Sequence, residues 1–119
     1  MGKDKQSCFD KRNIVYKIDC IDCDATYIGQ SSRKLRFRVN EHKRDVRKKK
    51  STSALAKHTL QTDHTINFDR PKIMDTEVSY KKRCFLEMMN IHYHKNNINK
   101  MQDTQFLKHI YKYAINLLQ

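Results

Sequence analysis

The sequence predicts an α+β fold in which a small three-stranded antiparallel sheet is flanked by helices and followed by a C-terminal helix. Residues 13–19 alternate between the two sides of a strand, and a short polar connection leads to a second strand at 26–28, which favours a β-hairpin. From residue 33 onward, apolar side chains recur mainly at helical spacing. The chain has 119 residues, a length that suits one domain.

The expected elements follow one another without internal repeats. They are a loose basic lead-in (1–12), strands at 13–19, 26–28 and 66–74, and helices at 33–49, 54–61, 78–94 and 104–118. Pro71 marks an edge or bulge of the third strand, because proline has no N–H to donate. We therefore divide the chain into the lead-in, a main domain at 13–100, and a final amphipathic helix within 101–119 that packs on this domain.

Basic residues are concentrated in and just after the first expected helix. The net charge of the chain is +12, and ten of the 18 residues from 33 to 50 are Lys or Arg. One face of this helix should be strongly positive and bind nucleic acid through its phosphates, although a solvated lysine-rich surface is the alternative. The residues assigned to this surface are Arg33, Lys34, Arg44, Arg47, Lys48, Lys49 and Lys50, together with Gly29.

Gly29 stands out because it is the only glycine after Gly2. A chain that uses almost no glycine implies either a positive φ at this position or a close approach that a side chain would block. An ordinary turn at the end of the strand is the alternative.

Neither a membrane span nor a signal peptide is expected. No apolar run is long enough to cross a bilayer, and the N-terminus is polar. We therefore expect a protein that does not contact membranes and lies inside the cell, in the nucleus. In that setting the four cysteines favour free thiols or metal binding over disulfides.

Two cysteines and two histidines have the spacing of a zinc site. Cys20 and Cys23 form a CxxC pair, and His58 and His64 follow after a gap of 34 residues. The long gap predicts a structural zinc site that joins the hairpin connection to the end of the second helix. A redox CxxC is less consistent, because a strand rather than a helix follows it. Reduced cysteines with surface histidines remain the other alternative.

Four further polar residues occupy positions where packing would favour apolar ones. Tyr16 and Tyr27 lie on strands that should pair, although tyrosines on strands usually serve packing. Arg38 lies one helical turn before His42, at the edge of the apolar stripe of the first helix. A buried arginine implies an anionic partner, and a surface arginine at the margin of the stripe is the alternative.

Glu87 lies on the expected apolar face of the third helix, which also holds Tyr80, Cys84, Met88 and Ile91. A carboxylate there should be protonated, paired or bound to a metal. A salt bridge to the first helix is the alternative.

The order of these residues resembles that of the GIY-YIG nucleases. Ile14-Val15-Tyr16 and Tyr27-Ile28-Gly29 look like the two motifs that name the family, with Ile14 in place of the first glycine. In this resemblance the family's essential arginine falls on Arg38, its frequent histidine or tyrosine on His42, its metal-binding glutamate on Glu87, and its closing asparagine on Asn99, or on Asn96 or Asn97 in another register. The match covers roughly residues 13–100.

The chain is more specifically similar to the endonuclease domain of Penelope-like retroelements. That domain has a CxxC just before the second motif and a later histidine pair, which correspond to Cys20, Cys23, His58 and His64. The resemblance implies a domain that is joined to a reverse transcriptase in its parent polypeptide. It also implies DNA nicking that primes reverse transcription at the target, with no small-molecule substrate.

The resemblance implies a mechanism in which the phenols, Arg38 and Glu87 meet around one phosphate. Glu87 would hold one Mg²⁺ or Mn²⁺ ion, and Arg38 would stabilise charge on the non-bridging oxygens. Tyr16 would position or deprotonate the attacking water, supported by Tyr27 and His42.

Two other functions are compatible with parts of the sequence. A zinc-stabilised module that binds nucleic acid without cutting it would account for the charge and the Cys/His set. A small interaction domain would dock on a partner through Leu107, Ile110 and Leu118 of the final helix.

Overall fold

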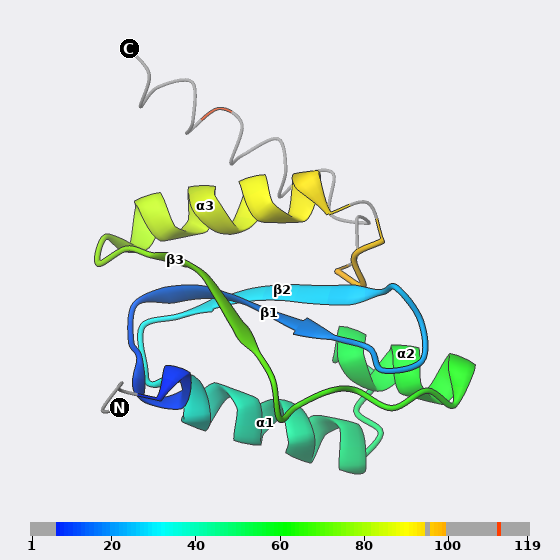
Figure 1. Ribbon diagram of the computed structural model, residues 1–119. Coiled ribbons are helices and arrows are strands. Elements are labelled where there is room, and N and C mark those ends of the chain that lie inside the picture. Colours follow the sequence, from blue (N-terminus) through cyan, green and yellow to red (C-terminus); the bar gives the residue numbers. More distant parts are fainter. Residues whose placement is uncertain (1–6, 95, 100–111, 113–119) are drawn as a thin grey trace, which may run out of the picture.

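The computed structural model describes residues 7–94, 96–99 and 112, and it confirms the α+β fold (Figure 1). A three-stranded antiparallel sheet has the strand order β2-β1-β3. The elements are the 3-10 helix η1 (Cys8–Asp10), β1 (Ile14–Asp19), β2 (Thr26–Ser31), α1 (Leu35–Arg47), α2 (Ala54–Thr62), β3 (Lys72–Thr76) and α3 (Tyr80–Tyr93). Apart from residue 112, the final helix expected at 104–118 lies outside the described residues.

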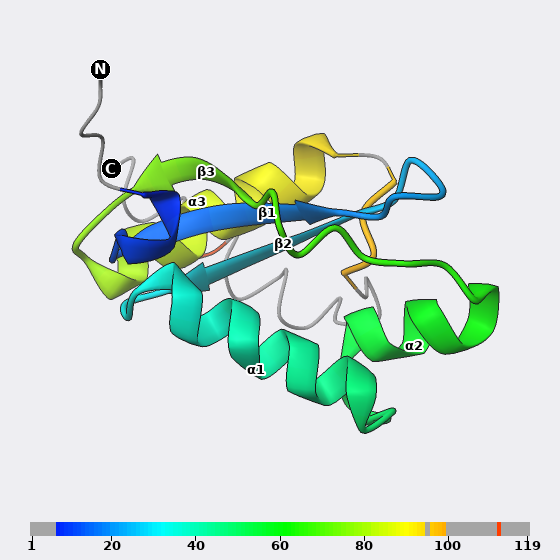
Figure 2. The ribbon, with the colours of Figure 1, turned by 60° about the horizontal axis from the view of Figure 1, so that its bottom comes forward.

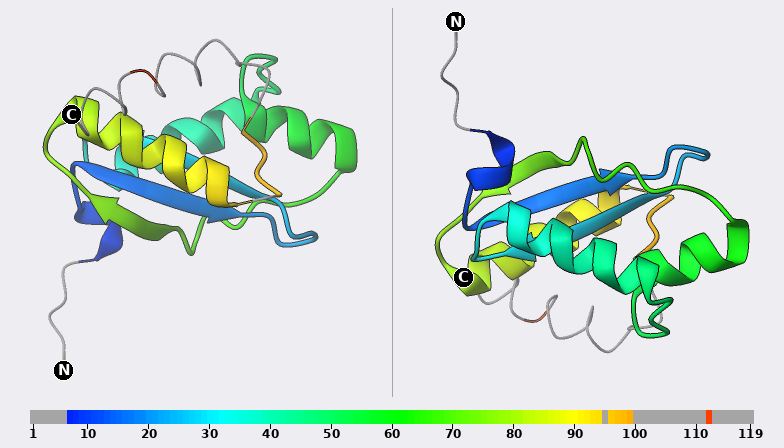
Figure 3. Two further views of the ribbon diagram at one scale, coloured as in Figure 1. Left: turned by 90° about the horizontal axis from the view of Figure 1, so that it is seen from above. Right: turned by 90° about the horizontal axis from the view of Figure 1, so that it is seen from below.

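Helices cover both faces of the sheet. In Figure 2, α1 and α2 lie on the same side of the sheet, and the two views of Figure 3 show α3 over one face and α1 and α2 over the other. Alternation along β1 explains this arrangement, because Ile14, Tyr16 and Ile18 belong to the core that includes Leu35 of α1. Val15 points the other way and packs in a second core with residues of α3.

Several elements differ in extent from those expected. β2 continues through Gly29 to Ser31, because β1 is long enough to pair with all of it. The third strand begins at Lys72 rather than at residue 66, and Ile66 makes only an isolated bridge to Cys20. Residues 8–10 of the expected loose lead-in form a 3-10 turn, and the neighbouring carbonyl of Lys11 accepts a hydrogen bond from the N–H of Leu35.

A short segment after α3 runs along the free edge of β2. The N–H of Ile98 donates to the carbonyl of Thr26, and the N–H of Thr26 donates to the carbonyl of Asn96. This pairing satisfies part of an edge that would otherwise be open. Among the described residues, no helix has both the length and the apolar character needed to span a membrane.

Candidate active site and metal centre

The sheet brings the two predicted tyrosines together beneath α1. Tyr16 and Tyr27 have ring centroids 6.4 Å apart, and the edge of the His42 imidazole contacts Tyr27 at 5.0 Å between centroids. The hydroxyl of Tyr16 lies 2.8 Å from Nε2 of His42. Tyr16 is fully buried, whereas Tyr27 is only partly buried. The two phenols therefore share one imidazole but differ in their access to solvent.

Gly29 makes room for the phenol of Tyr16. A Cβ atom at Gly29 would lie 2.5 Å from the Tyr16 hydroxyl oxygen and 2.6 Å from Cζ, and the φ of Gly29 is not positive. The close approach expected of this glycine is therefore to a side chain of the same chain. The assignment of Gly29 to the nucleic-acid surface was wrong, because the residue is buried within the sheet beside this ring.

Burial keeps the hydrogen-bonded pair electrically neutral. Burial and the nearby charge of Arg38 lower the pKa of His42 from 6.5 to about 3. Burial, together with the neighbouring Tyr27, raises the pKa of Tyr16 well above its ordinary value. At neutral pH a neutral imidazole thus faces a neutral phenol, and one proton lies in the hydrogen bond between them.

Arg38 lies at the margin of the apolar stripe of α1, as expected, and points toward the sheet. Its Nη1 donates to Oε1 of Glu41 at 2.9 Å. Arg33 donates to both carboxylate oxygens of Glu41, at 2.9 and 2.8 Å. Glu41 was not predicted as a site residue, although its i+3 spacing from Arg38 is a signal that could have found it.

Glu87 carries a partly buried carboxylate without a counter-charge in contact. Among the described residues it has no hydrogen-bond or ion-pair partner, so the expected alternative of a salt bridge to α1 is not observed. Burial raises the pKa of Glu87 from 4.5 to about 7, against the opposing charges of Arg38 and Arg83.

Charges on α1 and α3 act on the same two phenols. The charge of Arg38 lowers the pKa of Glu87, and the charges of both residues shift the pKa values of Tyr16 and Tyr27. The two phenols, the guanidinium and the carboxylate, which come from four different elements, are therefore electrostatically coupled.

The buried face of α3 differs from the expected one at two positions. Tyr80 is 64% exposed, whereas Arg83 is 3% exposed and was not predicted. The Nε of Arg83 donates to Oε1 of Gln30 at 2.7 Å, and its Nη1 donates to the carbonyl oxygens of Glu77 and Val78. Because most of these acceptors are backbone or amide oxygens, no charge pattern in the sequence could have indicated them.

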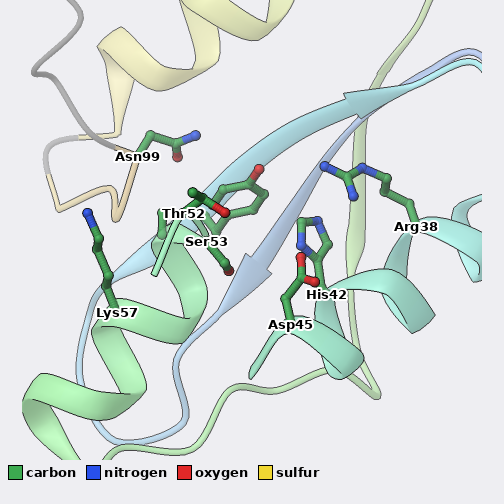
Figure 4. Close-up of a pocket in the computed structure, with 9 residues that line it drawn as sticks. Arg38, His42, Asp45, Thr52, Ser53, Lys57 and Asn99 are labelled. Carbon is green, nitrogen blue, oxygen red and sulfur yellow. The ribbon is translucent and has the colours of Figure 1, made fainter. Parts of the chain in front are cut away.

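A polar cavity of about 300 Å³ opens beside this group, between α1, α2 and the β2 edge (Figure 4). Its lining combines predicted site residues with unpredicted ones: Tyr27, Arg38, His42, Asp45, Thr52, Ser53, Ala54, Lys57 and Asn99. Tyr16 and Glu87 are not part of this lining. The cavity therefore extends the candidate site toward α2, which the sequence did not connect with it.

Asn99 is the asparagine that borders the cavity. Its side-chain amide exchanges two hydrogen bonds with the backbone of Ile28, at 2.8 and 2.6 Å. The side-chain NH₂ of Asn97 instead donates to the carbonyl oxygens of Ile91 and His94 at the end of α3. Of the three asparagines considered as the closing residue of the motif set, only Asn99 borders the cavity.

The basic residues of the predicted nucleic-acid surface lie on and just after α1. Lys34 is half-buried, and the others (Arg33, Arg44, Arg47, Lys48, Lys49 and Lys50) are exposed. α1 ends at Arg47, earlier than expected, and Lys49 adopts a left-handed φ of 55° just beyond it.

The predicted Cys/His cluster is assembled at the far end of the hairpin. The ligand atoms of Cys20, Cys23, His58 and His64 all lie within 4.8 Å of one another. Sγ of Cys20 is 3.5 Å from Nδ1 of His64, and Sγ of Cys23 is 3.7 Å from Nε2 of His58. Tetrahedral zinc with bonds of about 2.3 Å to sulfur and about 2.0 Å to nitrogen would separate these atoms by about 3.6 Å. The four residues can hold a metal ion such as zinc.

Comparisons with known proteins give no relative for this chain. No family model, no curated protein and no solved structure matches it.

Proposed function

We propose that this chain is a metal-dependent DNA endonuclease of the GIY-YIG type that hydrolyses phosphodiester bonds. One observation carries the proposal: Tyr27 and Arg38 border a polar cavity, and the charges of Arg38 and of the partly buried, unpaired Glu87 act on both phenols. A purely structural role does not explain a carboxylate kept in an environment that raises its pKa to about 7.

Glu87 is the proposed ligand of the catalytic cation. Its carboxylate lacks a partner among the described residues, and oxygen ligands of this kind suit Mg²⁺ or Mn²⁺. When bound, the cation would supply Lewis-acid stabilisation of the scissile phosphate and of the departing 3′ oxygen.

Arg38 would bind the non-bridging oxygens of the same phosphate. Its guanidinium borders the cavity and is already held by one hydrogen bond to Glu41, which leaves other N–H groups free to donate. A bound phosphate would also add negative charge beside His42 and oppose one cause of its low pKa.

The two phenols would position the attacking water. Tyr27 borders the cavity, and the Tyr16 hydroxyl contacts Nε2 of His42. In the proposed step, the attacking water gives its proton to His42, which borders the cavity and is held in place by the buried Tyr16 hydroxyl at Nε2, so that hydroxide attacks phosphorus as the bond to the 3′ oxygen breaks. His42 then carries the proton that the departing oxygen requires.

The Cys/His cluster is proposed to bind one zinc ion with a structural role. Four protein ligands complete a tetrahedral site and leave no position open for substrate. Burial and the neighbouring His64 lower the pKa of His58, which favours the neutral imidazole that a metal requires.

The basic surface on and after α1 is proposed to hold DNA through its phosphates, with weak sequence preference. By resemblance to Penelope-like retroelements, nicking would prime reverse transcription in the nucleus, in concert with a reverse transcriptase domain of the parent polypeptide.

Nicking of supercoiled plasmid, measured with Mg²⁺ or Mn²⁺ and again with excess EDTA, tests the proposal. We expect cation-dependent relaxation by the parent chain and none by Glu87→Gln. Glu77→Gln is a matched control, because Glu77 accepts a hydrogen bond from Ser79 that a glutamine oxygen can also accept. Equal nicking by Glu87→Gln and the parent would refute the assignment.

The exposed basic surface and the Cys/His cluster also fit a module that binds nucleic acid without cutting it. In that case plasmid would be retained in a gel-shift measurement but would stay supercoiled with every divalent cation tested.

A further inference from the structure

We propose that Lys57 of α2 binds a DNA phosphate next to the scissile one, at the far end of the cavity that Arg38 borders. This inference rests on the proposed endonuclease function and extends it to a second backbone subsite. It concerns a residue that the sequence did not single out.

Lys57 is a half-buried cation that faces the cavity. It lines the cavity together with Arg38, His42 and Asn99. In Figure 4, Lys57 and Arg38 lie toward opposite ends of the cavity, with His42 between them. A phosphate held at Arg38 would therefore leave the Lys57 end available for the next part of the same strand.

The ammonium of Lys57 is not paired within the part of the chain that the structure describes. No carboxylate forms an ion pair with it, whereas Arg38 is bonded to Glu41. A partly buried ammonium without a counter-ion favours the binding of an anion.

The one carboxylate in the cavity lining does not cancel this charge. Asp45 belongs to α1 and lies 4.0 Å from Nζ of Lys50, which offsets its negative charge. The other residues that α2 and the segment before it add to the cavity lining are neutral: Thr52, Ser53 and Ala54. The Lys57 end of the cavity is therefore positive and polar, which suits phosphate rather than a cation or an apolar group.

The Cys/His cluster explains why Lys57 is held in this position. His58 is the next residue on α2, and its Nε2 faces Cys23 of the hairpin connection. Consecutive residues on an α-helix point about 100° apart, so a helix fixed through His58 directs Lys57 to a different side. Here that side is the cavity.

The volume of the cavity also fits more than one phosphate group. A cavity of about 300 Å³ reaches the lower size of ligand-binding clefts, and its lining is mostly polar. A segment of sugar-phosphate backbone between Arg38 and Lys57 would occupy it.

Steady-state nicking of an oligonucleotide duplex tests the subsite. For Lys57→Ala we expect KM to rise about tenfold with kcat nearly unchanged, because the contact is made equally in the ground and transition states. Lys57→Arg should restore most of the affinity. Lys82→Ala is the matched control, because Lys82 is exposed on α3, over the opposite face of the sheet.

A binding measurement without catalysis separates this inference from the proposed function. With the same duplex and no added Mg²⁺ or Mn²⁺, the plot of log Kd against log salt concentration should become shallower by about one unit for Lys57→Ala only. Equal behaviour of Lys57→Ala and Lys82→Ala would overturn the inference even if the parent nicks DNA. If the parent binds DNA in the predicted way but never nicks it, the proposed function fails and the Lys57 contact stands.

Discussion

The molecule contains two polar clusters, the Cys/His cluster and the group around Tyr16, and they differ in whether their polar groups are matched to one another. In the Cys/His cluster, four donor atoms face one another at distances that a single tetrahedral ion would satisfy. Around Tyr16, by contrast, His42 has a pKa of about 3 and Glu87 one of about 7, with no ion-pair partner for Glu87 among the described residues. The first cluster is complete with one ion, and the second needs both a cation and an anion. The difference fits the proposed division into a structural metal site and a catalytic site.

Removing Arg38 should have a large effect on activity. Arg38→Ala is expected to lower the nicking rate by about 10³-fold, because loss of one preorganised donor to the developing charge costs that much in other enzymes. Arg36→Ala is the control, since Arg36 pairs with Asp10 away from the cavity. Initial rates on plasmid check this, and comparable losses in the two variants would remove the distinction between site and surface arginines.

Disrupting the Cys/His cluster should act on stability first. Cys23→Ala is expected to abolish stoichiometric zinc binding and to lower the free energy of unfolding by about 3 kcal/mol or more. Cys8→Ala, which changes a cysteine outside the cluster, should retain the metal. Metal analysis combined with chemical denaturation measures both quantities. An unchanged unfolding curve for metal-free Cys23→Ala would contradict a structural role for this cluster.

Glu87→Gln should stabilise the protein while it inactivates it. The pKa of Glu87 is 4.5 without the fold and about 7 within it, so the ionised carboxylate destabilises the folded state. That penalty is absent below pH 4.5, grows as the pH rises toward 7 and then levels off at up to about 3 kcal/mol. Without divalent cations, the stability difference between Glu87→Gln and the parent should therefore widen over this interval. A stability difference that does not depend on pH would mean that the fold does not raise the pKa of Glu87.

Adding a single methyl group at Gly29 should lower stability by less than the loss of the Cys/His cluster does. Its Cβ would overlap the Tyr16 ring, which is buried and bonded to His42 and therefore has little space to move. We expect Gly29→Ala to cost about 2 kcal/mol of stability and to slow nicking. Thermal unfolding with parallel rate measurements tests this, and a neutral outcome in both would argue against a fixed Tyr16–His42 contact.

The two clusters also differ in how far the sequence predicts them. The spacing of Cys20, Cys23, His58 and His64 is sufficient to predict that these four side chains come together, because cysteine and histidine at this spacing are typical metal ligands. The first helix was predicted for a similar reason, because its buried residues Leu35, Val39 and His42 recur at helical spacing, which is a local pattern.

Other features depend on tertiary contacts that leave no local pattern. Arg83 is buried because carbonyl oxygens of the β3–α3 connection accept its hydrogen bonds, and those acceptors exist in every sequence. Lys57 borders the cavity only because α2 is placed beside α1. The late start of β3 reflects pairing with β1, which a run of apolar residues beginning at Ile66 does not specify.

The central claim is that Arg38 and Glu87 act on the same phosphate. Its most direct test is the nicking rate, in Mg²⁺, of the parent, Arg38→Ala, Glu87→Gln and the double variant. Residues that act as one unit give non-additive losses, so we expect the double variant to be no slower than the slower single variant. Losses that multiply in the double variant, or single variants as active as the parent, would contradict the claim.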